Sequence, residues 1–440
     1  MSDPKMEKRL AQLEQRVAEL EKENAELKRL VVFLTNPHIS SSKKLIKEKK
    51  EETEKEPPKK KGAPEGHQGA TRETPIPDQI MYLKPELCAN KKCRGKKINI
   101  LKEYKKTVED IEIKKKTTEF HFFECECLEC GKIFTTTSKD LPKLGIFGPN
   151  ITSLWSSLHY IGTVPFDRLS KISRYLLRMD ITPAALHNIT YRNAKIFKPQ
   201  FERRKMTLAR SRYVRSDETS YSVNGKKWYL WNLSNGKTNV VLIRNSRGSK
   251  VLKEVFGDFL DAILNSDCFS AYSKFKAREY QKCWAHVLRD AENLAKFNDE
   301  GKELHRILLE MYCYIKNAKE KNLEGTPKIK TWIRKQKNKI DLWLDKNYES
   351  KAVKNLVLRM SKYKNDWFTC LKYSFVEATN NGSERDIRKN VLARKISGLH
   401  RSQLGIDSRE IMMSEIITAE HRNENPLEII QEGIEKYNLS

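Results

Sequence analysis

Residues 213–264 constrain the fold more than any other part of the sequence, because they contain a series of segments typical of strands and a helix. The pattern of residues 213–223 is typical of a strand, and a two-residue Asn-Gly turn joins them to a second strand that starts at residues 228–231. Residues 240–243 form a short apolar run that predicts a third strand. A helix near residues 249–259 precedes a buried-looking strand at residues 262–264. The sequence therefore predicts an α/β domain with three antiparallel strands, a helix and a further strand.

This order of elements is that of the ribonuclease-H-like fold, and three acidic residues fall within it. Asp217 lies in the first strand, Asp267 follows the strand at 262–264, and Glu384 opens a later helix. Cutting and rejoining a phosphodiester needs two divalent metals roughly 4 Å apart, and carboxylates suit magnesium. We predict that the three residues are catalytic and bind two Mg²⁺ (or Mn²⁺) ions. Adjacent strand residues face opposite sides, so spacing alone does not choose between Asp217 and Glu218.

The helix that opens at Glu384 also carries positive charge. Arg388 and Lys395 lie four and eleven positions further on, so both share a helix face with Glu384. A cationic stripe beside a metal-binding carboxylate would hold a DNA backbone next to the metals. The alternatives are an intrahelical Glu384–Arg388 pair and a capping box between Asn381 and Glu384.

Five of the nine cysteines lie between positions 88 and 130. Cys88-x4-Cys93 and Cys127-x2-Cys130-Gly form two half-sites on either side of a strand-rich segment, and four thiolates at such turns suit a structural Zn²⁺ ion. The spacing predicts a zinc ribbon, with Cys125 as a spare that could replace a neighbour. Four cysteines leave no open position for substrate, so the expected role is structural or DNA-contacting. The alternative is small buried cysteines without metal.

The first 36 residues carry a seven-residue repeat that predicts a coiled coil. One seam position holds Leu10, Val17, Asn24 and Val31, and the other holds Met6, Leu13, Leu20, Leu27 and Leu34. Valine at the first position, leucine at the second and a single asparagine favour a parallel homodimer. The alternative is a surface helix packed on its own chain. Residues 40–77 contain almost no apolar side chains and cannot bury a core, so we expect a basic linker there.

Charge and hydropathy point to an intracellular protein that meets a polyanion. The formal net charge is +27, which favours phosphate contacts, although a general lysine bias is the alternative. No apolar run is long enough to span a bilayer, and the first twenty residues are charged throughout, so we expect a cytoplasmic, nucleoid-associated protein with no membrane partner. Residues 146–210 have helical spacing, and DNA binding or simple scaffolding would explain them equally well.

Together these patterns predict a multidomain α+β protein. The expected segments are a coiled-coil dimerisation helix (1–36), a basic disordered linker (37–79), a zinc-ribbon domain (80–138), a helical DNA-binding segment (139–210), the first part of the ribonuclease-H-like core (211–283), a helical insertion (284–375), and the second part of that core with C-terminal helices (376–440).

Several short motifs resemble, in order, those of the insertion-sequence-66 family of bacterial and archaeal transposases. The matching residues are the Lys61–Gly69 segment, the four ribbon cysteines, Asp217-Glu218-Thr219, Ser266-Asp267 with Ala271-Tyr272, Cys283-Trp284-Ala285-His286, and Ser383-Glu384-Arg385 with Arg394-Lys395. The resemblance covers most of the chain and favours Asp217 over Glu218 as the first catalytic acid. The chain departs from the family at Glu65 in the linker and in the wide Cys88-x4-Cys93 spacing.

The resemblance implies a DDE transposase that cleaves transposon ends and transfers the 3′-hydroxyl strand into target DNA. It implies that His286, Arg385, Arg394 and Lys395 contact DNA or support the site, with a core role as the alternative for His286. We expect Arg388 to contact DNA as well, because it shares the helix face of Glu384. The expected partners are the terminal inverted repeats, target DNA, a second copy of the chain and accessory transposition proteins. Two rival functions are a catalytically inactive zinc-ribbon DNA-binding regulator and a nuclease that does not join strands.

Overall fold

The computed structural model describes residues 16–17, 19–20, 75–90, 92–397 and 400–440. The chain divides into two compact units, one formed by Met1–His38 with Thr117–Ser440 and the other by Ile39–Lys116. The described residues at positions 16, 17, 19 and 20 are helical, and the rest of the predicted coiled coil and most of the linker lie outside the described residues. No described helix is long and apolar enough to cross a membrane.

The larger unit contains all of the helices and strands considered below. Its strands are β1 (Glu124–Glu126), β2 (Ile133–Thr135), β3 (Tyr213–Val223), β4 (Lys226–Ser234), β5 (Asn239–Arg244), β6 (Phe259–Ser266) and β7 (Lys276–Lys282). Its helices are α2 (Pro149–Tyr160), α3 (Phe166–Tyr175), α4 (Pro183–Ile196), α5 (Lys198–Ala209), α6 (Lys250–Phe256), α7 (Ser270–Lys274), α8 (Trp284–Ala295), α9 (Asp299–Glu320), α10 (Pro327–Leu344), α11 (Lys351–Lys362), η2 (Thr369–Leu371), α12 (Asn381–Ser397), α13 (Gln403–His421) and α14 (Pro426–Leu439).

Five strands form one mixed sheet in the order β5-β4-β3-β6-β7. Strands β3, β4 and β5 are antiparallel neighbours, whereas β6 and β7 run parallel to β3. The turn between β3 and β4 has positive φ at both Asn224 (46°) and Gly225 (72°), as a two-residue hairpin turn of type I′ requires. The predicted series of three antiparallel strands, a helix and a further strand is confirmed.

The fifth strand, β7, was not predicted. Its sequence, KAREYQK, is mostly charged and polar, and its side chains are exposed or half-buried until the last two residues. A strand at the edge of a sheet needs little apolar patterning, because only one of its sides pairs with a neighbour. Its ladder to β6 therefore sets its position.

Three hydrophobic clusters hold the larger unit together. The main cluster covers both the sheet and the helices α5, α6, α13 and α14, with Trp231 and Tyr272 among its fully buried side chains. A second cluster belongs to the predicted helical insertion, where α8–α11 pack around Trp284 and Trp367. A third, smaller one joins α2, α3 and α4 around Trp155. Helices also form where the sequence predicts them: α2–α5 within residues 146–210, α8–α11 within 284–375, and α12–α14 within 376–440.

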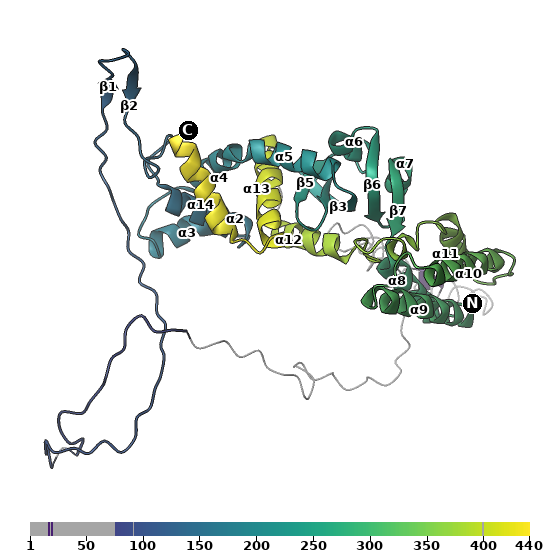
Figure 1. The fold of residues 1–440 in the computed structure, drawn as a ribbon, viewed down its shortest axis with the longest axis horizontal. Helices are drawn as coiled ribbons and strands as arrows, with labels where there is room; N and C mark the ends of the chain where they lie inside the picture. The colour runs from purple at the N-terminus through teal and green to yellow at the C-terminus, as the bar shows by residue number, and fades with distance from the viewer. Residues whose placement is uncertain (1–15, 18, 21–74, 91, 398–399) are drawn as a thin grey trace, which may run out of the picture. The chain divides into compact units, whose positions relative to one another are not determined.

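Helix α13 covers the outer edge of the sheet, next to β5 (Figure 1). Four residues of a helix rise about 6 Å and two residues of a strand about 6.7 Å, so side chains spaced by four match every second N–H of the strand. Three hydrogen bonds of this kind form: Thr418 Oγ1 accepts from Asn239 N (3.0 Å), Ser414 Oγ from Val241 N (2.8 Å), and Glu410 Oε1 from Ile243 N (2.6 Å). The helix therefore closes an edge that another strand could otherwise join.

Replacement of Ser414 by alanine should destabilise the protein through this edge. The Val241 N–H would stay buried without a partner, which costs about 1–3 kcal/mol. Urea unfolding should show a free energy of unfolding lower by that amount. Ser153→Ala is the matched control, because Ser153 is equally buried but its hydroxyl donates to the Asn150 carbonyl of its own helix. An equal effect of the two substitutions would contradict the edge-capping role.

The predicted zinc-ribbon segment contains much less strand than its sequence pattern indicated. Among described residues 80–90 and 92–138, only β1 and β2 are strands, and they pair as a short antiparallel hairpin. Val108, Ile111 and Phe122 alternate but are exposed, and no strand forms there. The alternation was misleading because a strand also needs a partner and a face to bury, neither of which a local pattern supplies.

Candidate active site

The parallel pairing of β3 and β6 brings the first two predicted acids to the same edge. The ladder pairs Tyr213 with Ile263 and Arg215 with Asn265. The ladder ends there, and Asp217 and Asp267 each lie two residues beyond this last pair. Both side chains are half-buried. Residues that are 50 positions apart in the chain therefore share one level of the sheet.

Helix α12 carries the third acid, and the residue before the helix anchors it. Asn380 is fully buried, and its side-chain amide donates to the Ser216 carbonyl on β3 (2.8 Å). Its backbone N–H donates to Cys283 Sγ at the end of the β7 strand (3.0 Å), and its carbonyl accepts from Glu384 N (3.2 Å). These contacts fix the first turn of α12, and with it Glu384, against the strand that holds Asp217.

The three carboxylates interact electrostatically. Burial raises the pKa of Asp217 well above its usual range, and the charges of Glu218, Asp267 and Glu384 raise this pKa further. One hydrogen bond opposes the shift, from the Glu218 N–H to Asp217 Oδ1 (2.9 Å). Oxygen donors that repel one another in a half-buried site suit a divalent cation, which would compensate the shared negative charge. The donor set therefore fits magnesium or manganese.

Glu218 is held on the other side of β3 by its own partners. Its Oε1 accepts from Arg247 Nη2 (2.7 Å) and Nε (2.9 Å), and its Oε2 accepts from the Tyr272 hydroxyl. Burial raises the pKa of Glu218 to about 7, and the nearby charge of Asp267 contributes. With both oxygens engaged, Glu218 is poorly suited to bind an ion, which leaves Asp217 as the available acid of this pair.

The raised pKa of Glu218 predicts a pH-dependent stability. The folded protein binds this proton more tightly than the unfolded chain, so the free energy of unfolding should fall as pH rises from about 4.5 to about 7. Glu218→Gln should make this decline shallower in urea-unfolding experiments with a chelator present. Glu424→Gln, at an exposed position, should keep the wild-type slope. An unchanged slope in Glu218→Gln would contradict the prediction.

A buried lysine supports the strand end that carries Asp267, and sequence reasoning missed it. Lys282 is only 1% exposed, and its ammonium donates to the Asp267 carbonyl (3.0 Å) and to Ser266 Oγ (3.2 Å). Burial lowers its pKa. Asp267 Oδ1 in turn accepts from Phe269 N (2.9 Å). The strand end is therefore held from both its main chain and its side chain.

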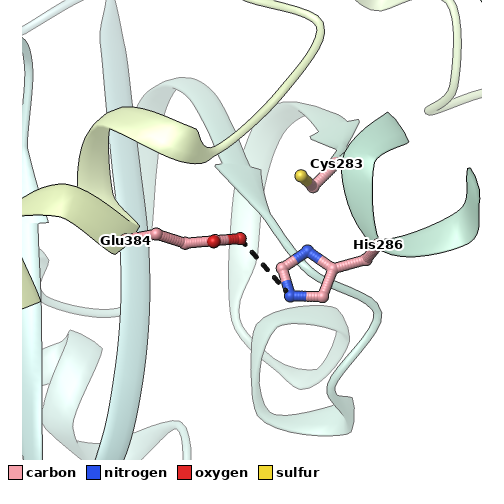
Figure 2. A group of neighbouring side chains, drawn as sticks. All are labelled: Cys283, His286 and Glu384. Carbon is pink, nitrogen blue, oxygen red and sulfur yellow. Dashed lines mark ion pairs between the residues drawn. The ribbon is translucent and has the colours of Figure 1, made fainter. Parts of the chain in front are cut away.

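His286 lies beside Glu384, the third predicted acid. Figure 2 shows the imidazole between the Cys283 thiol and the Glu384 carboxylate. His286 Nε2 is 3.6 Å from Glu384 Oε1, and Arg289 Nη2 is 3.9 Å from Glu384 Oε2. Burial raises the pKa of Cys283 to about 11. The Cys-x2-His motif thus places both of its ligand-type side chains against Glu384.

The predicted cationic residues of α12 divide into two groups. Arg385, Arg388 and Lys395 are exposed, as a phosphate contact requires. Arg394 is only 6% exposed, and its guanidinium donates to the Ser220 carbonyl on β3. In this structure Arg394 therefore fastens α12 to the sheet, a contact that a local charge pattern could not indicate.

The four predicted zinc ligands lie in two turns that belong to different units. Cys93 N donates to the Asn90 carbonyl (2.9 Å) in the smaller unit, and Gly131 N donates to the Cys127 carbonyl (2.8 Å) in the larger one. Gly131 has a φ of 69°, which suits a tight turn at glycine. Backbone N–H groups of Cys130 and Glu129 lower the pKa of Cys127. Each turn alone is compatible with a metal-binding thiolate, and the four-cysteine site stays a prediction.

Comparison with known proteins agrees with the motifs. A search of the curated proteins found no match. A protein-family model described as "Transposase IS66 family" matches residues 144–408, which include β3, β6 and α12 with their three acids. Since this match covers more than half of the 440 residues, the chain belongs to the IS66 family of transposases.

Proposed function

We propose that this protein is a DDE transposase, which nicks DNA at transposon ends and transfers the exposed 3′-hydroxyl strand to target DNA. Asp217, Asp267 and Glu384 are its catalytic residues. The proposal is supported by the positions of Asp217 on β3, Asp267 directly after β6 and Glu384 on α12, and by the charges of Asp267 and Glu384, which both raise the pKa of Asp217. Membership of a transposase family supports the same conclusion.

The sheet order also supports the proposal. Three antiparallel strands followed by two parallel ones, in the order β5-β4-β3-β6-β7, agree with a ribonuclease-H-like catalytic core. In such sheets, ligands gather beyond the carboxyl ends of the strands. Asp267 lies directly after the last residue of β6, and Asp217 lies at the same level on β3. The helical insertion of α8–α11 separates these acids in sequence from Glu384.

The three carboxylates would hold two Mg²⁺ (or Mn²⁺) ions. When bound, such a pair activates an attacking oxygen and stabilises the leaving oxygen of a phosphodiester. The residues around the acids then have separate tasks. Lys282 and Asn380 hold the two strand ends and α12 in place, and Arg247 with Tyr272 keeps Glu218 turned away from the ions.

The remaining segments would bring DNA to this site. Arg385, Arg388 and Lys395 are exposed on the helix that carries Glu384, where they would contact backbone phosphates. Helices α2–α5 and a structural zinc ribbon would bind the terminal repeats. The N-terminal coiled coil would pair two copies of the chain so that both transposon ends are processed together, with accessory transposition proteins as further partners.

A cleavage and joining assay tests the proposal. The purified chain would be incubated with Mg²⁺, a supercoiled plasmid carrying the element's terminal repeats, and a 3′-end-labelled repeat fragment. We expect nicking at the repeat ends and label covalently joined to plasmid. Nicking without joined label would reduce the function to that of a nuclease. Repeat binding without either reaction would refute the enzyme proposal.

A further inference from the structure

We propose that Cys283, His286 and Glu384 form a binding site for a zinc-like transition metal, separate from the magnesium site but sharing Glu384 with it. One potential ligand atom from each residue lies within 4.8 Å of the other two. Among the described residues, no other group of three histidine, cysteine, aspartate or glutamate side chains has ligand atoms this close together. Figure 2 shows the three side chains converging from the start of α8 and the first turn of α12.

The local fold explains why these side chains meet. Cys283 is the residue before α8, and His286 follows one helical turn later, so both point to the same side of the helix start. Asn380 joins this point to α12 through its N–H bond to Cys283 Sγ, and Glu384 lies four residues further along. The Cys-x2-His pair and the acid are therefore positioned by one shared backbone contact.

Two of the three side chains have ligand atoms that lack partners. His286 Nδ1 and Glu384 Oε1 are buried, and within the described part of the chain neither has a hydrogen-bond partner. Buried polar atoms in folded proteins are nearly always satisfied by protein, water or an ion. The imidazole and the carboxylate are 3.6 Å apart at their nearest recorded atoms, which is longer than a hydrogen bond. A cation held by the trio would take one imidazole nitrogen and a Glu384 oxygen as ligands.

The donor chemistry selects the kind of metal. A thiolate, an imidazole and a carboxylate suit zinc, whereas magnesium prefers oxygen ligands alone. Zinc bond lengths of about 2.0–2.3 Å place ligand atoms about 3.5 Å apart, so binding would draw the three atoms together slightly. Three protein ligands leave a fourth position for water. The bound metal must also displace the thiol proton of Cys283.

Because the two sites share Glu384, metal binding by the trio should affect DNA cleavage. This expectation rests on the proposed function. A zinc ion held by the trio would engage the carboxylate that the magnesium site needs. Zinc should therefore inhibit the Mg²⁺-dependent reaction, and it should do so through Cys283 and His286. Metal binding by the trio itself does not depend on any DNA chemistry.

Cobalt titration of the full-length chain tests the site directly. After dialysis against a chelator, Co²⁺ would be added while thiolate-to-cobalt absorption and bound equivalents are measured. We expect Cys283→Ser to bind one equivalent less than wild type, with a weaker thiolate band. Cys313→Ser is the matched control, since this exposed cysteine of α9 should leave binding unchanged. The predicted ribbon cysteines are present in every variant, so any cobalt that they bind contributes equally to each titration.

Equal cobalt binding by wild type and Cys283→Ser would overturn the site. If Cys283→Ser does not fold, His286→Ala provides the test, because it keeps the thiol. In this variant the affinity for the same bound cobalt ion should fall at least tenfold. An unchanged affinity in His286→Ala would also overturn the site. In the cleavage assay, micromolar Zn²⁺ should inhibit wild type more strongly than His286→Ala, each relative to its own zinc-free rate. Absence of any Mg²⁺-dependent cleavage would count against the proposed function. The cobalt titration would still test the metal site, because it does not depend on cleavage.

Discussion

Asp267→Asn should abolish DNA cleavage and strand transfer while the protein stays folded and still binds the terminal repeats. An amide has one neutral oxygen in place of a charged pair, so it holds a divalent cation weakly. Metal assistance is worth several kcal/mol of transition-state stabilisation, which corresponds to a rate lower by roughly 1000-fold or more. The plasmid cleavage assay with 3′-end-labelled fragment measures both reactions.

The same substitution should not destabilise the metal-free protein. The charge of Asp267 raises the pKa of both Asp217 and Glu218, which means that the three groups repel one another in the folded state. Removal of one charge relieves this repulsion. We expect the urea midpoint of Asp267→Asn, with chelator present, to equal or exceed that of wild type. Addition of Mg²⁺ should then stabilise wild type more than the variant.

Asp261→Asn provides the matched control for this prediction. Asp261 lies on the same strand, β6, but it is exposed and pairs with Arg278 at 3.4 Å. Its substitution should leave cleavage within about twofold of wild type, since surface changes away from a site have small effects. Strand transfer by Asp267→Asn at a rate near wild type would refute the assignment of the catalytic acids. A loss of folding in that variant would contradict the repulsion argument.

The part of the site that lies on the sheet could be predicted because its determinants are local. The strand pattern at 213–223, the run Trp228–Trp231 and the Asn224-Gly225 turn predict β3 and β4, and the apolar run at 262–264 predicts β6. Once the two strands are parallel neighbours, their register sets Asp217 and Asp267 equally far beyond the last pair of the ladder. A strand pattern and a short turn carry this information in the sequence itself.

Contacts between distant segments could not be predicted in the same way. The burial of Arg394 depends on β3 lying beneath α12, and the role of Lys282 depends on the pairing of β7 with β6, which sets Lys282 beside Ser266. His286 was left open between a core role and a functional one, because nothing in a Cys-x2-His spacing tells which acid it will face. Long-range packing decides these points, and a single sequence does not display it.

Gly382→Ala should lower both stability and activity, because this glycine gives α12 room to approach β3. A methyl group at position 382 would lie 2.5 Å from Cζ of Arg215, and closer still to one of its guanidinium nitrogens. Arg215 is 5% exposed, and its Nη1 donates to both carboxylate oxygens of Glu377 (3.0 and 3.2 Å). The guanidinium would therefore have to shift away from this ion pair for the methyl group to fit. Overpacking of this kind costs typically 1–3 kcal/mol in free energy of unfolding.

The effect on activity should exceed the effect expected from lost stability alone. Glu384 lies two residues beyond Gly382, so a helix start displaced from β3 takes the third catalytic acid with it. A misplacement of about 1 Å can lower a rate about 100-fold, and we expect a loss of that order in folded Gly382→Ala protein. Gly148→Ala is the control, because a methyl group there would meet no atom within 4 Å.

A double-mutant cycle would show whether Arg215 is the obstacle. Lysine at position 215 lacks the planar guanidinium that the new methyl group would strike, although it also loses the paired contact with Glu377. If the clash is responsible, Arg215→Lys should cost less stability in the Gly382→Ala background than in wild type, with a coupling of about 1 kcal/mol. Purely additive effects would locate the cost elsewhere. They would also remove the reason to expect Glu384 to shift, since the displacement of α12 follows only from the contact between its first turn and the buried arginine on β3.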